Sequence, residues 1–293
     1  MTGRGRRIAR ITGPREAGRL SALDPRTAAW RTDLADLALA DRLAAPAYAA
    51  PAMRANAGGA VMMREGPAEG AVAVSELLPG ETFAVLEEAG GWCWGWSAHD
   101  HYVGFVPASA LGPAQAPTHM AGPGDALLFA APDIKAPVLA TLPAGSRLSV
   151  SGEAGAAFRA CLGGHIHVAH LVPVGGDAAG DWVAFAQGFL GSPYRWGGRT
   201  RHGIDCSGLV QLARMLAGRP VGRDSDMQAA AAAPVARARA RRGDIACWPG
   251  HIGILLSRTR LLHATAFGMT THIEPLAAVE ARAGRADIRR FPD

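Results

Sequence analysis

The sequence predicts an α+β protein in which two small β modules precede a domain of mixed helices and strands. Three observations lead to this prediction. From about Gly58 the chain consists of short apolar runs separated by Gly and Pro, which is typical of short strands. The same order of turn, alternating strand and hairpin recurs once further along, which indicates a repeated module. A helical period and then further β-type runs follow VGGDAAGD, and this combination is typical of an α+β domain.

Length and composition favour several folded domains. The chain has 293 residues, of which 49% are hydrophobic and 19% are charged. A single domain usually has ~100–200 residues, and this apolar content is that of a globular protein rather than a disordered one. The four cysteines have no CxxC spacing, so neither a disulfide framework nor a zinc site is indicated. A cytosolic thiol protein fits this pattern best.

Residues 1–50 are predicted to form a basic leader followed by a helical arm. The segment LADLALADRLAA is rich in Ala and Leu, and Pro46 and Pro51 interrupt it. The first 20 residues are expected to be disordered. Because no apolar run is long enough for a secretion signal or a membrane helix, a cytoplasmic location without a membrane partner is expected.

The net charge of +5 raises the question of a nucleic-acid partner. Outside the first 20 residues, arginines concentrate at Arg237, Arg239, Arg241 and Arg242, where they alternate with alanine or adjoin one another. Nucleic-acid sites usually interleave aromatic residues with such charges, and none occur here. The segment is therefore interpreted as solvated surface, and no nucleic-acid partner is expected. A small acidic substrate would also be compatible with the charge.

Two tandem copies of one small β-barrel module are predicted, over residues 51–113 and 114–176. In both segments a Leu-Pro turn with a glycine is followed by an alternating strand and a Gly-containing hairpin. A closing segment that contains Val-Pro follows in each copy. The second copy has weaker hairpin signals and few aromatic residues. It is therefore interpreted as a spacer.

Residues 177–293 are predicted to form the α+β domain. A helix is expected from Trp182 to Leu190, where Gly-Ser-Pro ends it. A longer amphipathic helix is expected from about Asp205, with Gly218 just after its end. Antiparallel strands are expected at DIACW, HIGILL, RLLHAT and THIEPL.

Cys206 lies in GIDCSGLVQ, at the start of the second predicted helix. The partial positive charge of a helix N-terminus stabilises a thiolate and is expected to lower the cysteine pKa below its free value of ~8.5. The unpaired N–H groups there could also hold an oxyanion. His251, at a strand start after Pro-Gly, is the candidate base, and His263 on the next strand could accept its other N–H. Taken singly, a buried Cys or a strand His is more often structural, and only the combination indicates catalysis.

These segments together resemble the NlpC/P60 family of papain-like cell-wall peptidases. The resemblance covers roughly residues 180–293 and is carried by GSPYRWGGRTRHGIDCSGLVQ, RGDIACW, HIGILL and LLHAT. The order of Cys206, His251 and His263 is similar to the family's Cys-His-His arrangement. The resemblance therefore implies a papain-like catalytic domain, a cysteine peptidase activity and no metal or organic cofactor.

Further site residues follow from the resemblance alone. It implies that Tyr194 lies near the thiolate with its hydroxyl aimed at the oxyanion site, and that Trp196 walls the pocket. Asp205 would pair with the ammonium of the substrate's L-alanine, while Ser207 and Ser225 would bind the D-glutamate carboxylate. The first two could instead be core aromatics. Asp205 could also be the N-cap of the helix, which is compatible with the other role.

Two SH3-like modules before such a domain resemble the γ-D-glutamyl-L-diamino acid endopeptidases. In that subfamily the first module helps to bind the substrate's amino group, a role that falls here on Glu76 and Tyr102, with Glu81 as the alternative to Glu76. The implied substrate is a small murein peptide with a free N-terminal L-alanine, cut before meso-diaminopimelate or L-lysine during cell-wall recycling. The oligomeric state is not determined by the sequence, although a monomer is favoured.

Two other functions remain open at this point. The SH3-like modules could be the functional part of a muropeptide-binding protein whose last domain is inactive, although the intact Cys-His-His set argues against this. A papain-like amidase or acyltransferase could act on a different amide. The proposed amine-binding residues Glu76, Tyr102 and Asp205 distinguish these possibilities, because they suit only a peptide with an exposed N-terminus.

Overall fold

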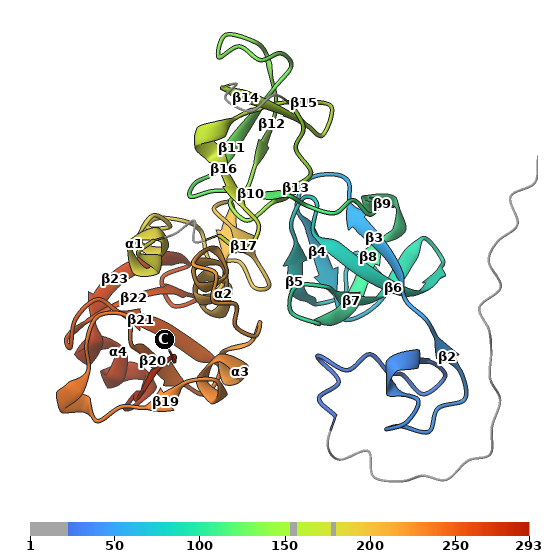
Figure 1. Cartoon of the computed structure of the whole chain (residues 1–293). Helices are drawn as coiled ribbons and strands as arrows, with labels where there is room; N and C mark the ends of the chain where they lie inside the picture. The colour runs from blue at the N-terminus through green and yellow to red at the C-terminus, as the bar shows by residue number, and fades with distance from the viewer. Residues whose placement is uncertain (1–22, 153–156, 177–179, 293) are drawn as a thin grey trace, which may run out of the picture. The chain divides into compact units, whose positions relative to one another are not determined.

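The computed structural model describes residues 23–152, 157–176 and 180–292 (Figure 1). The described chain divides into two compact units, one ending at Ala114 and one beginning at Gln115. Leu78–Gly80 are the exception, because this short segment belongs to the second unit. The basic leader lies outside the described residues, so its expected disorder stays a prediction. None of the helices in the described part of the chain is long and apolar enough to cross a membrane.

The predicted helical arm is wrong for residues 23–50. The segment holds two short paired strands, β1 (Ala35–Asp36) and β2 (Tyr48–Ala49), with only a 3₁₀ turn at Leu37–Leu39. The Asp36 carboxylate caps this turn by accepting from the Ala38 N–H, and it also accepts from the Trp96 indole N–H at 2.8 Å. These long-range contacts override the helix propensity of the Ala/Leu-rich sequence, since propensity is a weak preference.

The first module is a strongly bent sheet of seven strands. Its strand order is β5-β4-β8-β7-β6-β3-β9. Hairpin β6–β7 turns through Gly90 and Gly91, which both have positive φ, as a two-residue hairpin turn requires. The strands are β3 (Ala52–Asn56), β4 (Val61–Arg64), β5 (Ala73–Leu77), β6 (Thr82–Ala89), β7 (Trp92–Ser97), β8 (Val103–Pro107) and β9 (Leu111–Pro113).

The second module consists of two small sheets with the orders β13-β10-β16 and β12-β11-β15-β14. Both contain antiparallel pairs around a shared core that includes Leu128, Leu148 and Ile166. The strands are β10 (His119–Ala121), β11 (Ala126–Phe129), β12 (Val138–Leu142), β13 (Arg147–Leu148), β14 (Phe158–Cys161), β15 (Gly164–His167) and β16 (Leu171–Pro173).

The last segment forms the predicted combination of helices and an antiparallel sheet. Its sheet has six strands in the order β19-β24-β20-β21-β22-β23. The strands are β19 (Ala233–Pro234), β20 (Ile245–Trp248), β21 (His251–Leu255), β22 (Arg260–Thr265), β23 (Thr270–Pro275) and β24 (Asp287–Arg290). The helices are α1 (Trp182–Gln187), α2 (Cys206–Leu216), α3 (Ser225–Ala230) and α4 (Leu276–Ala283), and β17 (Arg199–Thr200) pairs with β18 (Gly203–Ile204).

Helix α2 is the centre of the main hydrophobic core. All of its residues are buried, and its apolar side chains pack with those of α1 and of strands β20 to β22. Leu78, Met120 and Ala144 belong to the same cluster, so the core extends beyond the α+β segment. A helix enclosed in this way is held rigidly, which fixes the position of whatever side chain stands at its first residue.

Candidate active site

Cys206 is the first residue of α2, and Asp205 is its N-cap. The Asp205 Oδ1 atom accepts from the Gly208 N–H at 2.7 Å, so the predicted capping role is confirmed. Gly208 has no room for a side chain, because a Cβ there would lie 2.4 Å from the Gly198 carbonyl oxygen. This close approach brings the preceding loop to the helix start, where the Gly197 N–H donates to Asp205 Oδ2 at 2.8 Å.

The sulfur of Cys206 lies beside the start of β21. The backbone N–H groups of Ile252 and Ser207 donate to it, and Ile252 directly follows His251. The Pro-Gly turn before His251 has Gly250 at φ +73°, a conformation that glycine adopts without strain. Helix start and strand start are thus brought together, as the sequence analysis expected.

His251 and His263 are in direct contact. The His251 Nε2 and His263 Nδ1 atoms are 2.8 Å apart, and the rings meet edge to face. His263 is 1% exposed. Because Nε2 of His251 is engaged in this bond, Nδ1 is the ring nitrogen left to take the proton of Cys206. This arrangement can perform acyl transfer to a thiol, with His251 as base and His263 orienting it.

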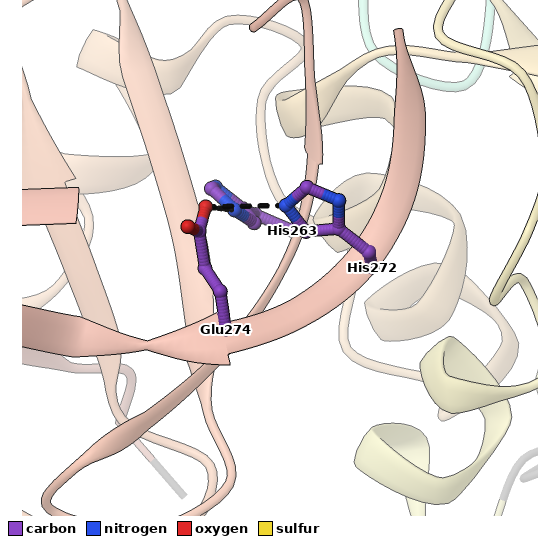
Figure 2. A group of neighbouring side chains, drawn as sticks. All are labelled: His263, His272 and Glu274. Carbon is purple, nitrogen blue, oxygen red and sulfur yellow. Dashed lines mark hydrogen bonds and ion pairs between the residues drawn. The ribbon is translucent and has the colours of Figure 1, made fainter. Parts of the chain in front are cut away.

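Glu274 was missed in the sequence analysis. Its Oε1 atom lies 2.7 Å from His263 Nε2 and 3.1 Å from His272 Nε2 (Figure 2). Arg282 of α4 donates to both carboxylate oxygens. The strand pattern held the only signal: His272 and Glu274 are two residues apart on β23, and side chains at that spacing share a face.

The same cluster is a possible metal site among the described residues. His263, His272 and Glu274 offer three ligand atoms within 4.8 Å of one another, a set of two imidazoles and a carboxylate that zinc accepts. The guanidinium of Arg282 already supplies a positive charge to the carboxylate. The hydrogen bonds of Glu274 therefore account for the cluster without an ion.

The expected direction of the Cys206 pKa is wrong. Burial, followed by the nearby Asp205 carboxylate, raises the pKa of the Cys206 thiol to about 11, and these effects outweigh the N–H groups at the helix start. Burial, together with the neighbouring His263, lowers the pKa of His251 to about 4. At neutral pH the site therefore holds a thiol and a neutral imidazole. Proton transfer must accompany attack on the substrate.

This protonation state can be tested by alkylation. We expect the rate at which iodoacetamide labels Cys206 in the free protein to keep rising above pH 9, because only the thiolate reacts and the thiol pKa is raised. Labelling of the peptide that contains Cys206, followed by mass spectrometry from pH 5 to 10, gives the profile. Glutathione under the same conditions is the reference. A plateau already reached near neutral pH would instead indicate a preformed thiolate.

Arg223 is a second residue that the sequence analysis missed. It is 1% exposed and pairs with Asp205 through Nη1–Oδ1 at 3.0 Å and Nη2–Oδ2 at 2.6 Å. Its Nη1 also donates to the Ser207 Oγ at 3.0 Å. The buried Asp205 carboxylate therefore accepts from one guanidinium, from the backbone N–H groups of Gly197 and Gly208, and from the Ser207 hydroxyl at 3.3 Å. Its predicted contact with a substrate ammonium remains a prediction.

The other predicted site residues of this domain differ in how exposed they are to solvent. Tyr194 is half-buried against the main core, and burial, then Cys206 and Asp205 nearby, raises its pKa, so its hydroxyl stays protonated. Trp196 is 61% exposed, and so is not a core aromatic. Ser225 is the first residue of α3 and half-buried. The roles of these residues toward substrate remain predictions.

Glu76 and Tyr102 belong to the first unit. Glu76 is 2% exposed on β5, and Tyr102 is 6% exposed just before β8. Glu81 is also buried, with its Oε1 atom 3.5 Å from His99 Nδ1. Both carboxylates are thus buried. Their assignment to an amine-binding role remains a prediction.

Comparisons with known proteins agree with the two-part organisation. Residues 63–111 match the bacterial dipeptidyl-peptidase SH3 domain, and residues 191–279 match the NlpC/P60 family. Dipeptidyl-peptidase 6 of Lysinibacillus sphaericus is 34% identical over 95 residues, which are 32% of this chain and 35% of that protein. A probable endopeptidase of Mycobacterium tuberculosis is 33% identical over 105 residues, 34% of this chain and 27% of that protein.

Most of the chain is similar in fold to a solved structure. An NlpC/P60 family protein from Bacillus cereus superimposes with a TM-score of 0.69 at 18% identity, over 82% of this chain and 99% of that one. At this identity the likeness concerns the fold alone. The curated relatives are matched over only about a third of their length, so their activities are not transferred to this chain by the match.

Proposed function

Because the chain is a member of the NlpC/P60 family with an SH3 domain of the bacterial dipeptidyl-peptidase type before its catalytic domain, we propose that it is a cysteine peptidase acting on murein peptides. The bond proposed for cleavage joins γ-D-glutamate to a diamino acid, meso-diaminopimelate or L-lysine. The observation that carries the activity is the arrangement of Cys206 at a helix start, beside a hydrogen-bonded pair of histidines. The similarity to dipeptidyl-peptidase 6 supports the substrate class.

The proposed reaction has two steps. Nδ1 of His251 takes the thiol proton while the Cys206 sulfur attacks the γ-glutamyl carbonyl carbon, and His251 then gives that proton to the departing amine. Water, activated by the same imidazole, hydrolyses the thioester and releases the peptide's L-alanyl-D-glutamate part. The Tyr194 hydroxyl and the N–H groups at the start of α2 are the proposed donors to the oxyanion.

The proposed specificity rests on a free N-terminal L-alanine. The proposed candidates for binding its ammonium are Glu76 and Tyr102 of the first module and Asp205 of the NlpC/P60 domain, while Ser207 and Ser225 would bind the D-glutamate carboxylate. Trp196 would wall the pocket. The N-terminal amino group of this alanine is free only after the peptide has been released from the glycan. We therefore also propose a cytoplasmic role in cell-wall recycling.

The test compares two peptides that differ only at the N-terminus. Purified protein is incubated with L-Ala-γ-D-Glu-meso-diaminopimelate and with its N-acetylated form, and released diamino acid is measured by mass spectrometry. We expect release from the free-amine peptide and at least a tenfold lower rate with the acetylated one, since acetylation removes a charge (about 1.4 kcal/mol per tenfold).

Other outcomes would change the assignment. Equal cleavage of both peptides would contradict the amine site and leave a broader endopeptidase. Absence of cleavage for both peptides, and for the lysine-containing analogue, would favour a muropeptide-binding protein or an enzyme that acts on a different amide. A Cys206→Ala preparation, purified in parallel, measures cleavage by contaminants.

A further inference from the structure

Three side chains in contact, His251, His263 and Glu274, lead from the candidate base to the surface of the domain. His251, His263 and Glu274 stand on the consecutive strands β21, β22 and β23 and are joined by contacts of 2.8 and 2.7 Å. We propose that Glu274 is a positioning residue that fixes the tautomers of both histidines and thereby leaves Nδ1 of His251 free to accept the proton of Cys206. The proposal rests on the proposed peptidase function.

The tautomers follow from what each atom can donate. An ionised carboxylate only accepts hydrogen bonds, so the bond to Glu274 requires a proton on His263 Nε2. A neutral His263 then has a bare Nδ1, which can only accept. The 2.8 Å contact with His251 must therefore be donated by His251 Nε2. A neutral His251 with a proton on Nε2 has its lone pair on Nδ1, the atom that a base needs.

Glu274 is held ionised and in place by its other partners. Arg282 Nη1 donates to Oε2 at 2.9 Å, and Arg282 Nη2 donates to Oε1. The guanidinium is itself fixed, because it lies 4.3 Å from the centroid of the Phe267 ring and donates to the Ala278 carbonyl oxygen. Hydrogen bonds from Arg282 and both histidines outweigh partial burial and hold the Glu274 pKa at about 2. The carboxylate is therefore charged throughout the pH range of any assay.

The strand register places the carboxylate where this role needs it. His263 is paired directly with His272 across β22 and β23, and Glu274 lies two residues further on the same face. It is thus the diagonal neighbour of His263, within reach of a long side chain. The Glu274 side chain is 16% exposed and that of His263 is fully buried, so the carboxylate connects a buried imidazole to the domain surface.

The test replaces the carboxylate with an amide of the same shape. In Glu274→Gln the amide N–H can donate to His263 Nε2, which reverses both hydrogen bonds and puts the proton of His251 on Nδ1. We expect kcat/KM for the free-amine murein peptide to fall by about 10²–10⁴-fold, with most of the loss in kcat, because a base in the wrong tautomer cannot accept the thiol proton.

A second readout needs no substrate. In the wild-type protein, ¹⁵N NMR of the imidazoles is expected to show protonated Nε2 and bare Nδ1 for both His251 and His263. In Glu274→Gln the protonated fraction at Nδ1 is expected to rise for both rings. Because this measurement does not depend on peptide cleavage, it can support or refute the positioning role even if the proposed substrate is wrong.

The matched control is Glu280→Gln. Glu280 is also a partly exposed glutamate paired with an arginine, Arg237, but it does not contact the histidines. In this variant we expect the tautomers of His251 and His263, and kcat/KM, to equal those of the wild type. Arg282→Met should shift the tautomers in the same direction as Glu274→Gln and by less, since the carboxylate remains but loses its anchor.

Three results would overturn the proposal. Unchanged tautomers in Glu274→Gln would show that the carboxylate does not select them. Lost activity with unchanged tautomers in a folded variant would assign Glu274 a different role. Activity that is abolished by a chelator and restored by zinc would mean that the cluster of His263, His272 and Glu274 acts as a metal site instead.

Discussion

Cys206→Ala is expected to lower the rate of diamino acid release by about 10⁴-fold or more, because covalent catalysis is lost when the nucleophile is removed. The cysteine is the first residue of a helix that is buried over its whole length, and its sulfur accepts from two backbone N–H groups. The neighbouring Ser207 hydroxyl does not replace the thiol readily, because its Oγ accepts from Arg223 and donates to Asp205. The residual rate should be the part that the remaining oxyanion donors and substrate binding still supply.

The matched control for this variant is Cys247→Ala. Cys247 is also a free, buried cysteine of the same domain, on β20, and burial raises the pKa of its thiol to about 12. Its replacement should change kcat/KM by less than about threefold, since a structural cysteine contributes only packing. Comparable losses in the two variants would mean that both act through folding, which circular dichroism of each protein would detect. Full activity in Cys206→Ala would refute the assigned nucleophile.

Arg223→Met is expected to lower the free energy of unfolding by about 3–5 kcal/mol, because it leaves a buried carboxylate without its counter-charge. Asp205 is 5% exposed, and Arg223 contributes both of its charge-assisted hydrogen bonds. The neutral donors that remain, the backbone N–H groups of Gly197 and Gly208 and the Ser207 hydroxyl, satisfy the carboxylate only in part. Urea unfolding followed by tryptophan fluorescence measures the difference.

Two further variants make this result specific. Arg258→Met removes an exposed arginine from the turn between β21 and β22 and should change stability by less than about 0.5 kcal/mol. Adding Asp205→Asn to Arg223→Met should recover part of the loss, since the unpaired charge is then also gone. If Arg223→Met were as stable as Arg258→Met, the ion pair would not be needed to hold the start of α2.

The sequence predicted well where one local signal decided the structure. The helix that begins at Cys206 has apolar residues at helical spacing and ends before a glycine, and it forms almost as expected, with Gly218 at φ +69°. The strand that begins after the Pro-Gly turn and carries His251, and the next strand, which carries His263, were likewise predicted. Their alignment beside the helix start required only that consecutive strands pair in an antiparallel sheet.

The sequence predicted poorly where distant partners decided the structure. The Ala/Leu-rich segment before Pro46 has helix formers throughout, yet Asp36 instead caps a single 3₁₀ turn and is held by Trp96, which lies 60 residues away in sequence. Glu274 and Arg223 were missed for the same reason. Their contacts with His263 and Asp205 join elements that are separate in the sequence. The direction of the Cys206 pKa depended on burial, which a helix-start position does not report.

The grouping of Leu78–Gly80 with the second unit bears on how the protein can be divided for study. Leu78 is fully buried in the cluster around α2, and the Pro79 carbonyl oxygen accepts from the Arg147 N–H. A fragment that starts at Gln115 would lack this leucine, and a cavity would open in the core beside the helix that begins at Cys206. Truncation at the apparent domain border would then yield a protein prone to aggregate, so loss of activity in such a fragment would say nothing about what the first module contributes to substrate binding.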